Sequence, residues 1–411
     1  MWLDPQKTPL LERPVDELKA PERLVLPLPA AAALCVREGA FVEMGQPLAR
    51  REDGFPALHS PVSGVVAAAR GGEACVRVAL QNDGRDTPFA GRSGSAGAGR
   101  GTPGLSAALR EAAVLAALSA RPLADELAAM ASRKTRTLVL HVVETEPYLC
   151  VSQKLLDENP DDVAAGFLLL MSACGARLAA LAVGDDVPSS TVDAFTAAAR
   201  MRGLAVQVEH IPQKFPYGDE RYLRPLLESR GVGAQQPQAA RMGFVCPEDC
   251  LFALRARDGE PQLSRFLAVA GDAVTNPQIL EVRIGTPVRA IFDRCGLSFE
   301  PDRVVLGGPM RGAAVTDLDA PVEKSTGAVL ALRAPHHPAS RSLCIGCGKC
   351  VSVCPEGLLP NYIAQRAVSA DFDALRELRI GDCVECGCCS YVCPGRMPIV
   401  ELIKNIKKAA Q

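Results

Sequence analysis

Apolar residues in the middle of the chain occur in short runs that alternate with longer amphipathic stretches. The runs at 137–143, 177–183 and 204–208 have the length of buried strands, and the stretches at 161–175 and 188–202 have helical spacing. A further stretch, 105–131, is rich in Ala and Leu and predicts a continuous helix. This alternation favours an open parallel sheet with helices on its faces, which is a Rossmann-like α/β domain.

The regions on either side of this domain have the patterns of β-structure. Between residues 20 and 90, short apolar strands are separated by Gly and Pro turns. Between 240 and 330, the runs 266–274 and 281–288 predict a strand, a turn and a second strand, followed by a short helix that ends at Cys295. Residues 91–104 are mostly Gly, Ser, Ala and Arg, which is typical of a flexible linker.

The last helix predicted from the pattern, at 397–408, places Ile399, Leu402, Ile403 and Ile406 on one face and lysines largely opposite. We expect this face to pack on the C-terminal domain. The alternative is a contact with a membrane partner or anionic lipid.

Composition limits the class of protein. The chain has 411 residues, enough for about two to four domains. Its net charge of −2 gives no argument for nucleic-acid binding. No stretch of about 18 uncharged apolar residues occurs, so no transmembrane segment is predicted. The predicted domains are 1–90, a linker at 91–104, 105–240, 241–333 and 334–411.

The C-terminal region contains two copies of one cysteine pattern. Each copy reads C-x2-C-x2-C-x3-C-P, and the second follows the first at an offset of 39 residues. This is the run that holds [4Fe–4S] clusters in bacterial ferredoxins, where the fourth cysteine binds the other cluster. The spacing therefore predicts two [4Fe–4S] clusters. One is assigned to Cys344, Cys347, Cys350 and Cys393, and the other to Cys383, Cys386, Cys389 and Cys354.

Zinc is the competing interpretation of the cysteines. Zinc sites usually combine two C-x2-C pairs, which gives four ligands in all. Eight cysteines in two C-x2-C-x2-C-x3-C-P runs fit that pattern poorly. Cys388 is interpreted as a spare thiol beside Cys389. We expect the seven cysteines elsewhere to be buried or free thiols. They are Cys35, Cys75, Cys150, Cys174, Cys246, Cys250 and Cys295.

Several segments, taken in order, resemble the C subunit of the Rnf electron-transport complex (RnfC). They are Glu144-Thr-Glu-Pro-Tyr148, Lys214-Phe-Pro-Tyr-Gly-Asp-Glu220, Gly285-Thr-Pro287, Leu306-Gly-Gly-Pro-Met-Arg-Gly312, Pro321-Val-Glu-Lys-Ser-Thr326 and the cysteine tail. The N-terminal strands resemble the barrel-sandwich hybrid of lipoyl and biotinyl domains, but residues 53–60 lack the lysine of a carrier domain. The resemblance implies a flavin-subunit-like α/β domain related to complex I, a β-grasp domain and a double ferredoxin domain.

In that family the α/β domain binds FMN and NADH through a glycine-rich loop. The corresponding stretch here, 114–122, contains no glycine. Family positions also differ at His141, Ser152 and Cys246. Glu144, Glu146 and Lys214 remain as candidate cofactor-binding residues of a vestigial site. We therefore expect two [4Fe–4S] clusters and neither FMN nor NADH.

The predicted function is an electron relay within a membrane-associated, Rnf-type ion-translocating oxidoreductase. Its predicted partners are the other subunits of the complex and a protein electron donor or acceptor. The predicted location is peripheral, at the cytoplasmic face of the bacterial inner membrane. No side chain is predicted to perform acid–base catalysis. Two alternatives are an NADH dehydrogenase subunit that uses FMN, and a soluble cluster-bearing subunit of another reductase.

Overall fold

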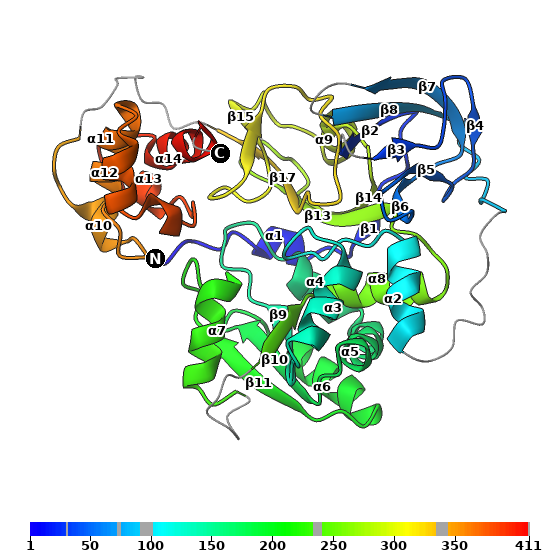
Figure 1. Ribbon diagram of the computed structural model, residues 1–411, viewed down its shortest axis with the longest axis horizontal. Coiled ribbons are helices and arrows are strands. Elements are labelled where there is room, and N and C mark those ends of the chain that lie inside the picture. The colour runs from blue at the N-terminus through cyan, green and yellow to red at the C-terminus, as the bar shows by residue number, and fades with distance from the viewer. Residues whose placement is uncertain (30–31, 72–74, 91–101, 233–240, 334–343, 410–411) are drawn as a thin grey trace.

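A computed structural model of the protein describes residues 1–29, 32–71, 75–90, 102–232, 241–333 and 344–409. Most of the predicted linker at 91–104 lies outside the described residues, and its last three residues begin helix α2 (Thr102–Glu111). Figure 1 shows a β unit built from β2 to β8, an α/β body, a second sheet above that body, and a helical lobe at the opposite end from the β unit, with the N-terminus beside the helical lobe.

The α/β body is built on a four-stranded parallel sheet, as predicted. The strand order is β11-β10-β9-β12. Leu138 and Leu140 of β9 face one core, and Val139 faces the other, so both faces of the sheet are buried. The strands are β9 (Thr137–Val142), β10 (Leu178–Gly184), β11 (Val206–Ile211) and β12 (Met242–Val245). Because β12 pairs with β9, the body extends beyond the boundary predicted at residue 240.

Helices cover both faces of this sheet, and the helices predicted at 161–175 and 188–202 are confirmed. One face holds α3 (Leu123–Ser132), α4 (Val151–Glu158), α5 (Pro160–Cys174), α6 (Ser189–Met201) and α8 (Pro247–Arg257). On the other face, α7 (Glu220–Ser229) packs through Leu223 and Leu227.

The continuous helix predicted at 105–131 is wrong. Helix α2 ends at Glu111 and α3 begins at Leu123, and residues between them form a loop in which Ala113 and Ala120 have positive φ values of 51° and 53°. Pro122 precedes α3, and a proline in a helix interior would remove a donor and clash with the preceding turn. Pro122 and the tertiary contacts of the loop therefore outweigh the helix propensity of the Ala and Leu residues in this stretch.

The second sheet has six strands in the order β1-β14-β13-β17-β15-β16. Leu267 and Val269 of β13 pack against Val288 and Ile291 of α9. The predicted strand pair and short helix are confirmed, but the second strand begins at Gln278 and the helix begins at Val288, where strand was expected. The elements are β1 (Asp16–Glu17), β13 (Ser264–Ala270), β14 (Gln278–Arg283), α9 (Val288–Cys295), β15 (Arg303–Leu306), β16 (Ala313–Val315) and β17 (Ala328–Leu332).

The β unit consists of two small antiparallel sheets around one apolar core. Leu26, Leu48 and Leu80 are completely buried in that core. One sheet has the order β2-β8-β7-β4 and the other β3-β5-β6. The strands are β2 (Arg23–Pro29), β3 (Ala33–Leu34), β4 (Phe41–Val42), β5 (Pro47–Arg50), β6 (Pro56–His59), β7 (Gly64–Gly71) and β8 (Cys75–Asn82).

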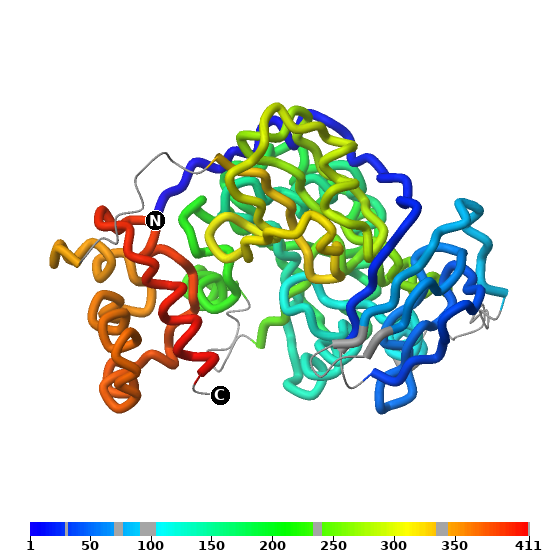
Figure 2. The backbone as a smooth tube through the Cα atoms, turned by 90° about the horizontal axis from the view of Figure 1, so that it is seen from above, coloured from blue at the N-terminus to red at the C-terminus, as the bar shows by residue number. Residues whose placement is uncertain are grey.

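Residues 1–18 do not belong to the β unit and instead form a strap across the α/β body. The Met1 ammonium donates to the Phe215 carbonyl at 2.7 Å, and the Tyr148 N–H donates to the Pro5 carbonyl at 2.8 Å. Lys7 pairs with Asp186 at 2.8 Å, just before α1 (Thr8–Leu11). Figure 2 shows this segment running from beside the helical lobe toward the β unit. The strap crosses the carboxyl ends of β9, β10 and β11, the edge where open α/β sheets bind ligands.

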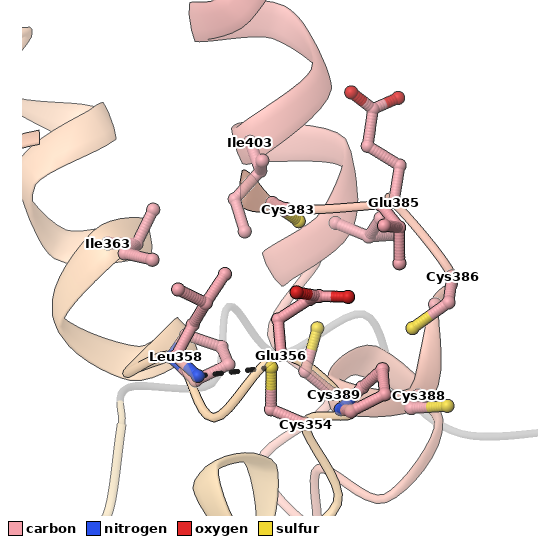
Figure 3. A pocket seen from close by; sticks show the side chains of 15 residues that line it. Cys354, Glu356, Leu358, Ile363, Cys383, Glu385, Cys386, Cys388, Cys389 and Ile403 are labelled. Atoms are coloured by element: carbon pink, nitrogen blue, oxygen red, sulfur yellow. Dashed lines mark hydrogen bonds between the residues drawn. The ribbon is translucent and has the colours of Figure 1, made fainter. Parts of the chain in front are cut away.

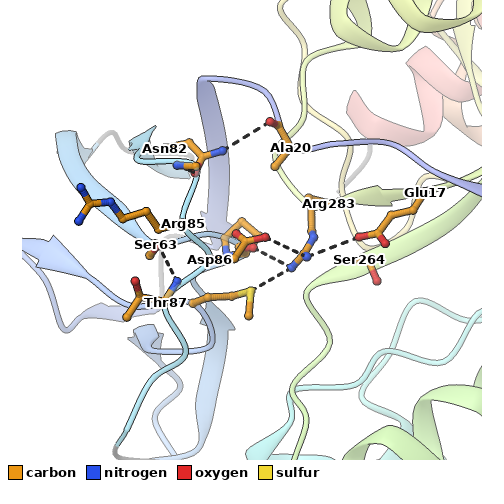
Figure 4. Close-up of polar contacts among 12 residues, drawn as sticks. Glu17, Ala20, Ser63, Asn82, Arg85, Asp86, Thr87, Ser264 and Arg283 are labelled. Carbon is orange, nitrogen blue, oxygen red and sulfur yellow. Dashed lines mark hydrogen bonds and ion pairs between the residues drawn. The ribbon is translucent and has the colours of Figure 1, made fainter.

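Arg283 of β14 joins the β unit to the second sheet (Figure 4). Its guanidinium donates to the Pro61 carbonyl at 3.1 Å and lies 3.4 Å from the Asp86 carboxylate and 3.5 Å from that of Glu17. The Arg283 side chain is 19% exposed, so water screens these contacts only partly. One side chain thus links three segments that are distant in the sequence.

The helical lobe is held together by an apolar core in which Ile363, Ile399 and Ile403 are buried. The predicted packing of the last helix on this lobe is therefore confirmed. Its elements are α10 (Lys349–Ser352), α11 (Pro360–Val368), α12 (Phe372–Glu377), a 3₁₀ turn η1 (Ile380–Asp382), α13 (Cys388–Tyr391) and α14 (Ile399–Ala409). Among the helices described here or above, none has the length and apolar character needed to cross a membrane.

Candidate functional site

Four cysteines of the helical lobe line one cavity. They are Cys344, Cys347, Cys350 and Cys393. The first three lie around the turn that leads into α10, where Gly346 and Gly348 both have a φ of 71°. Glycine adopts this left-handed backbone without the penalty that a Cβ would bring, so the loop can curl around the cavity. The thiols of Cys344 and Cys347 are on exposed residues, whereas Cys350 is buried.

The other four cysteines of the repeat line a second cavity. They are Cys354, Cys383, Cys386 and Cys389, and Figure 3 shows the side chains around it. The Leu358 N–H lies 3.4 Å from the Cys354 sulfur and donates to it. The fourth cysteine of each repeat thus lies in the cavity formed by the first three cysteines of the other repeat.

The spacing of these thiols bears on the choice between zinc and a cluster. Four thiolates around one zinc ion lie within about 4 Å of one another, because each Zn–S bond is about 2.3 Å long. Within the described parts of the chain, no three His, Cys, Asp or Glu side chains lie close enough to share one metal ion. Each cavity is lined by three cysteines of one repeat and the fourth cysteine of the other, which is the ligand arrangement of two-cluster ferredoxins.

Cys388 lines the second cavity but differs from its neighbours. Figure 3 shows its sulfur directed away from those of Cys354 and Cys389. The Cys388 residue is only 1% exposed and packs with Phe215 of the α/β body. A hydrogen bond from the Cys388 thiol lowers the pKa of Cys386 to about 6. Burial raises the pKa of Cys389 to about 12.

The second cavity abuts both the α/β body and the loop between β15 and β16 of the second sheet. A Cβ on Gly387 would lie 2.7 Å from the Met310 carbonyl oxygen, so only glycine permits this close approach. The Tyr222 hydroxyl of α7 donates to the Glu356 carboxylate at 2.6 Å. The Arg311 guanidinium lies over the Phe215 ring, 5.6 Å from its centre. These contacts place the second cysteine set at the interface and leave the first set on the outside of the lobe.

A cavity of about 440 Å³ lies at the carboxyl end of the α/β sheet. Glu144 and Glu146 both line it, whereas Lys214 does not and instead holds its ammonium 5.2 Å from the centre of the Tyr217 ring. The structure therefore brings together two of the three candidate cofactor-binding residues. The cavity also borders Arg311 and Phe215, so it reaches the contact with the second cysteine set.

The two glutamates are already held by backbone donors. The Glu144 carboxylate accepts the N–H groups of Ser152 and Gln153 at 3.0 and 3.1 Å. The Glu146 carboxylate accepts those of Met310 and Arg311 at 2.6 and 2.9 Å. Burial raises the pKa of both carboxyl groups above its ordinary value. The Glu144 carboxylate thus holds the start of α4, and the Glu146 carboxylate holds the loop that contains Met310 and Arg311.

The loop at 112–122, which borders the cavity, tests whether a flavin phosphate fits. A phosphate-binding loop needs backbone N–H groups that are free to donate. Here the Ala117 N–H donates to the Asp249 carboxylate at 2.8 Å, the Leu115 N–H to the Gln262 amide at 3.0 Å, and the Ala116 N–H to the Arg121 carbonyl at 2.8 Å. A carboxylate therefore occupies a position where a phosphate would need to accept. These residues do not fit the phosphate of FMN.

Acidic groups outnumber basic ones around the cavity. Glu144, Glu146, Asp219 and Glu248 line it together with Arg265 and Arg311. The two arginines already pair with carboxylates, Arg265 with Glu248 at 3.4 Å and Arg311 with Asp219 at 2.9 Å. Both arginines that could hold a phosphate in this cavity are therefore already engaged.

Sequence reasoning missed several of these residues. Arg311 lies in a segment that resembles the family pattern, and Asp249 lies in a segment that departs from it. Neither segment carries another signal in the sequence. A signal for Arg311 was its place directly after the Gly-Gly-Pro-Met turn. Nothing in the local pattern indicated that Phe215 would reach the cysteine lobe.

Comparison with known proteins gives the family. Residues 118–248 match the Nuo51 FMN-binding domain, and residues 343–397 match the 4Fe-4S dicluster domain. The chain is 31% identical over 380 residues to the C subunit of the Na⁺-translocating ferredoxin:NAD⁺ oxidoreductase complex of Acetobacterium woodii, covering 88% of this chain and 84% of that protein. The chain belongs to the RnfC family. The resemblance seen in the sequence is therefore confirmed.

A second relative shows how the family varies in length. The C subunit of the ion-translocating oxidoreductase complex of Rhodobacter capsulatus is 32% identical over 262 residues, which are 62% of this chain and 50% of that protein. This RnfC-family chain thus spans about half the length of that relative.

A solved structure of an NAD⁺-reducing [NiFe]-hydrogenase in its H₂-reduced state shares the fold. Its TM-score is 0.52 at 14% identity, over 75% of this chain and 61% of that chain. The chain is therefore a mixed α/β protein with a Nuo51-like domain and a C-terminal ferredoxin-like 4Fe-4S domain.

Proposed function

We propose that this RnfC-family chain is the electron-transfer subunit of a membrane-associated, Rnf-type ion-translocating oxidoreductase. The observation that carries the proposal is the pair of four-cysteine cavities, one within the lobe's outer part and one against the α/β body. The names of the relatives place them in ion-translocating complexes. The partners are the other subunits of such a complex and a protein that donates or accepts electrons.

In this proposal, each cavity holds one [4Fe–4S] cluster. Cys344, Cys347, Cys350 and Cys393 bind the first cluster, and Cys383, Cys386, Cys389 and Cys354 bind the second. When bound, each cluster supplies reversible one-electron chemistry. The Leu358 N–H donates to the Cys354 sulfur and so stabilises negative charge on that thiolate. Ile399 lines the first cavity and Ile403 the second, and both exclude water from the inner sides.

The finer division of the fold is part of the same proposal. Residues from about 20 to 90 form a barrel-sandwich hybrid without a carrier lysine, which acts as a structural or docking module. The α/β domain runs from about 102 to 257, because β12 and α8 belong to its sheet and core. Residues 258–333 with β1 form the β-grasp domain, and 344–409 form the double ferredoxin domain. The chain is peripheral at the cytoplasmic face of the inner membrane.

We infer that the α/β domain holds neither FMN nor NADH, because its loop donors are engaged and both arginines of its cavity already pair with carboxylates. Electrons then reach the clusters from another protein. A second candidate function, NADH dehydrogenase with FMN, has the domain match at 118–248 and the 440 Å³ cavity in its favour. Both candidates share the two clusters and differ in the flavin.

Iron, acid-labile sulfide and acid-released flavin per chain distinguish them, measured on protein purified without oxygen. The proposed relay predicts about eight irons and no flavin, as for two [4Fe–4S] clusters. One FMN per chain would favour the dehydrogenase, and a chain without iron would exclude both. An Asp249→Ala variant is the matched control for the loop. It removes the carboxylate that accepts the Ala117 N–H, so that this N–H is free to donate to a flavin phosphate. Co-sedimentation of the wild-type chain with membranes in its native cells tests the complex separately.

A further inference from the structure

The two cysteine cavities correspond to each other beyond their cysteines. The offset of 39 residues that relates the cysteine runs also relates other residues that line the first cavity to residues that line the second. These pairs are Ile345 and Val384, Pro394 and Pro355, Met397 and Leu358, Ile399 and Pro360, and Asn361 and Val400. A residue beside one cavity can therefore be compared directly with its counterpart beside the other.

Each cavity is bordered by the start of a helix. Asn361 is the second residue of α11 and lines the first cavity, and Val400 is the second residue of α14 and lines the second cavity. The N–H groups in the first turn of a helix have no acceptor within that helix. Each of these two N–H groups therefore needs an acceptor from outside its own helix.

The two N–H groups donate to different acceptors. Burial raises the pKa of the Cys350 thiol, and a backbone hydrogen bond from Asn361 to its sulfur opposes that effect. The Val400 N–H instead donates to the Ser390 hydroxyl at 2.9 Å. In the first repeat, the position of Ser390 is occupied by Val351, which has no hydroxyl. A single difference between the repeats thus decides whether the helix donates to a cysteine sulfur.

We propose that Ser390 lowers the reduction potential of the second cluster by accepting the N–H of Val400, whose counterpart donates to a ligand sulfur in the first repeat. This proposal rests on the proposed function, because it requires a cluster in each cavity. Hydrogen bonds to the sulfurs help to set the potential of a cluster. An N–H directed at a sulfur stabilises the reduced cluster, which carries one more negative charge. Ser390 is therefore a positioning residue that favours electron transfer from the second cluster to the first.

Ser390→Ala tests this role, because it leaves the Val400 N–H free to donate to the Cys389 sulfur. We expect the potential of the second cluster to rise and that of the first to stay unchanged in an EPR-monitored redox titration. The equilibrium for sharing one electron between the clusters should shift about fivefold toward the second, the typical net effect of one hydrogen bond. Ser390→Thr keeps the hydroxyl and should retain the wild-type potentials, which separates the hydrogen bond from packing.

The first repeat supplies the reciprocal variant and the matched control. Val351→Ser introduces a hydroxyl at the counterpart of Ser390, where it can accept the Asn361 N–H, so the potential of the first cluster should fall. Ser352→Ala is the control, because it removes a serine hydroxyl from the same lobe without touching either N–H. The exposed Ser352 hydroxyl donates to the Lys349 carbonyl at 2.9 Å. Neither potential should change in this variant.

Iron content is measured first for every variant, and only iron-loaded protein enters the comparison. An unchanged or lower potential of the second cluster in Ser390→Ala would overturn the proposal, and so would an equal shift in Ser352→Ala. If Ser390→Ala does not retain its iron, Val351→Ser decides, and an unchanged potential of the first cluster would then overturn the proposal. A wild-type chain without iron would instead show that the proposed function has failed.

Discussion

The Tyr222 hydroxyl of α7 donates to the carboxylate of Glu356 at 2.6 Å and so ties the α/β body to the segment that follows Cys354. Arg221 adds a weaker contact, 3.7 Å from the same carboxylate. Burial and the hydrogen bond to Glu356 both raise the pKa of Tyr222, which keeps the hydroxyl protonated as a donor. This hydrogen bond is one of several contacts that hold the second cysteine set against the body, together with the packing of Cys388 on Phe215.

Replacing Tyr222 with Phe should loosen that contact. The change removes one hydrogen bond to a charged group, which contributes about 1.5 to 3 kcal/mol. We expect faster hydrogen exchange at the amides of 354–358 in Tyr222→Phe, measured by mass spectrometry. Tyr362→Phe is the control, since Tyr362 is 52% exposed on the same lobe. Unchanged exchange in Tyr222→Phe would show that the apolar contacts alone hold the lobe.

Arg283→Ala should separate the β unit from the second sheet. The side chain contacts Asp86, Glu17 and the Pro61 carbonyl, and its loss leaves these groups without their shared donor. We expect a loss of about 2 kcal/mol in the free energy of unfolding. Denaturant unfolding of the full chain measures it. Arg289→Ala should cost far less, because Arg289 and Asp319 form an exposed pair, with side chains 57% and 69% exposed.

Glu248 should make stability depend on pH. Burial raises its pKa from 4.5 to about 7, against the opposing effect of Arg265. Between these values the folded chain keeps the proton and the unfolded chain releases it, so stability falls as the pH rises from about 4.5 to about 7. The fall is on the order of 3 kcal/mol. Glu248→Gln should flatten this slope in thermal unfolding measured without oxygen, and the exposed Glu260→Gln should leave it unchanged.

Arg311 should raise the reduction potential of the second cluster. Its guanidinium favours the negative form of Cys386, and added positive charge near a cluster favours the reduced state. Arg311→Gln should therefore lower that potential in an EPR-monitored redox titration. The first cluster is the internal control, because its cavity does not border Arg311. Equal shifts of both clusters would contradict this local effect.

The parallel sheet and the grouping of cysteines were predictable from the sequence because both depend on spacing along the chain. The loop at 112–122 was mispredicted as helix because Asp249 and Gln262, more than 100 residues away, hold its N–H groups. The strap could not be predicted either, since residues 1–18 show no strong periodicity and are placed by contacts such as that of Lys7 with Asp186. The cluster ligands themselves stay a prediction, which cysteine variants can test.

Cys389→Ser and Cys388→Ser should differ sharply although the residues are adjacent. Cys389 lies with Cys354, Cys383 and Cys386 around the second cavity, whereas the Cys388 sulfur is directed away from Cys354 and Cys389 (Figure 3). We expect Cys389→Ser to retain about four irons and Cys388→Ser about eight, as for one and two [4Fe–4S] clusters. Iron analysis and EPR spin counting after reduction measure this. Loss of four irons from Cys388→Ser alone would make Cys388 the ligand, because serine preserves its small size and removes only the thiolate.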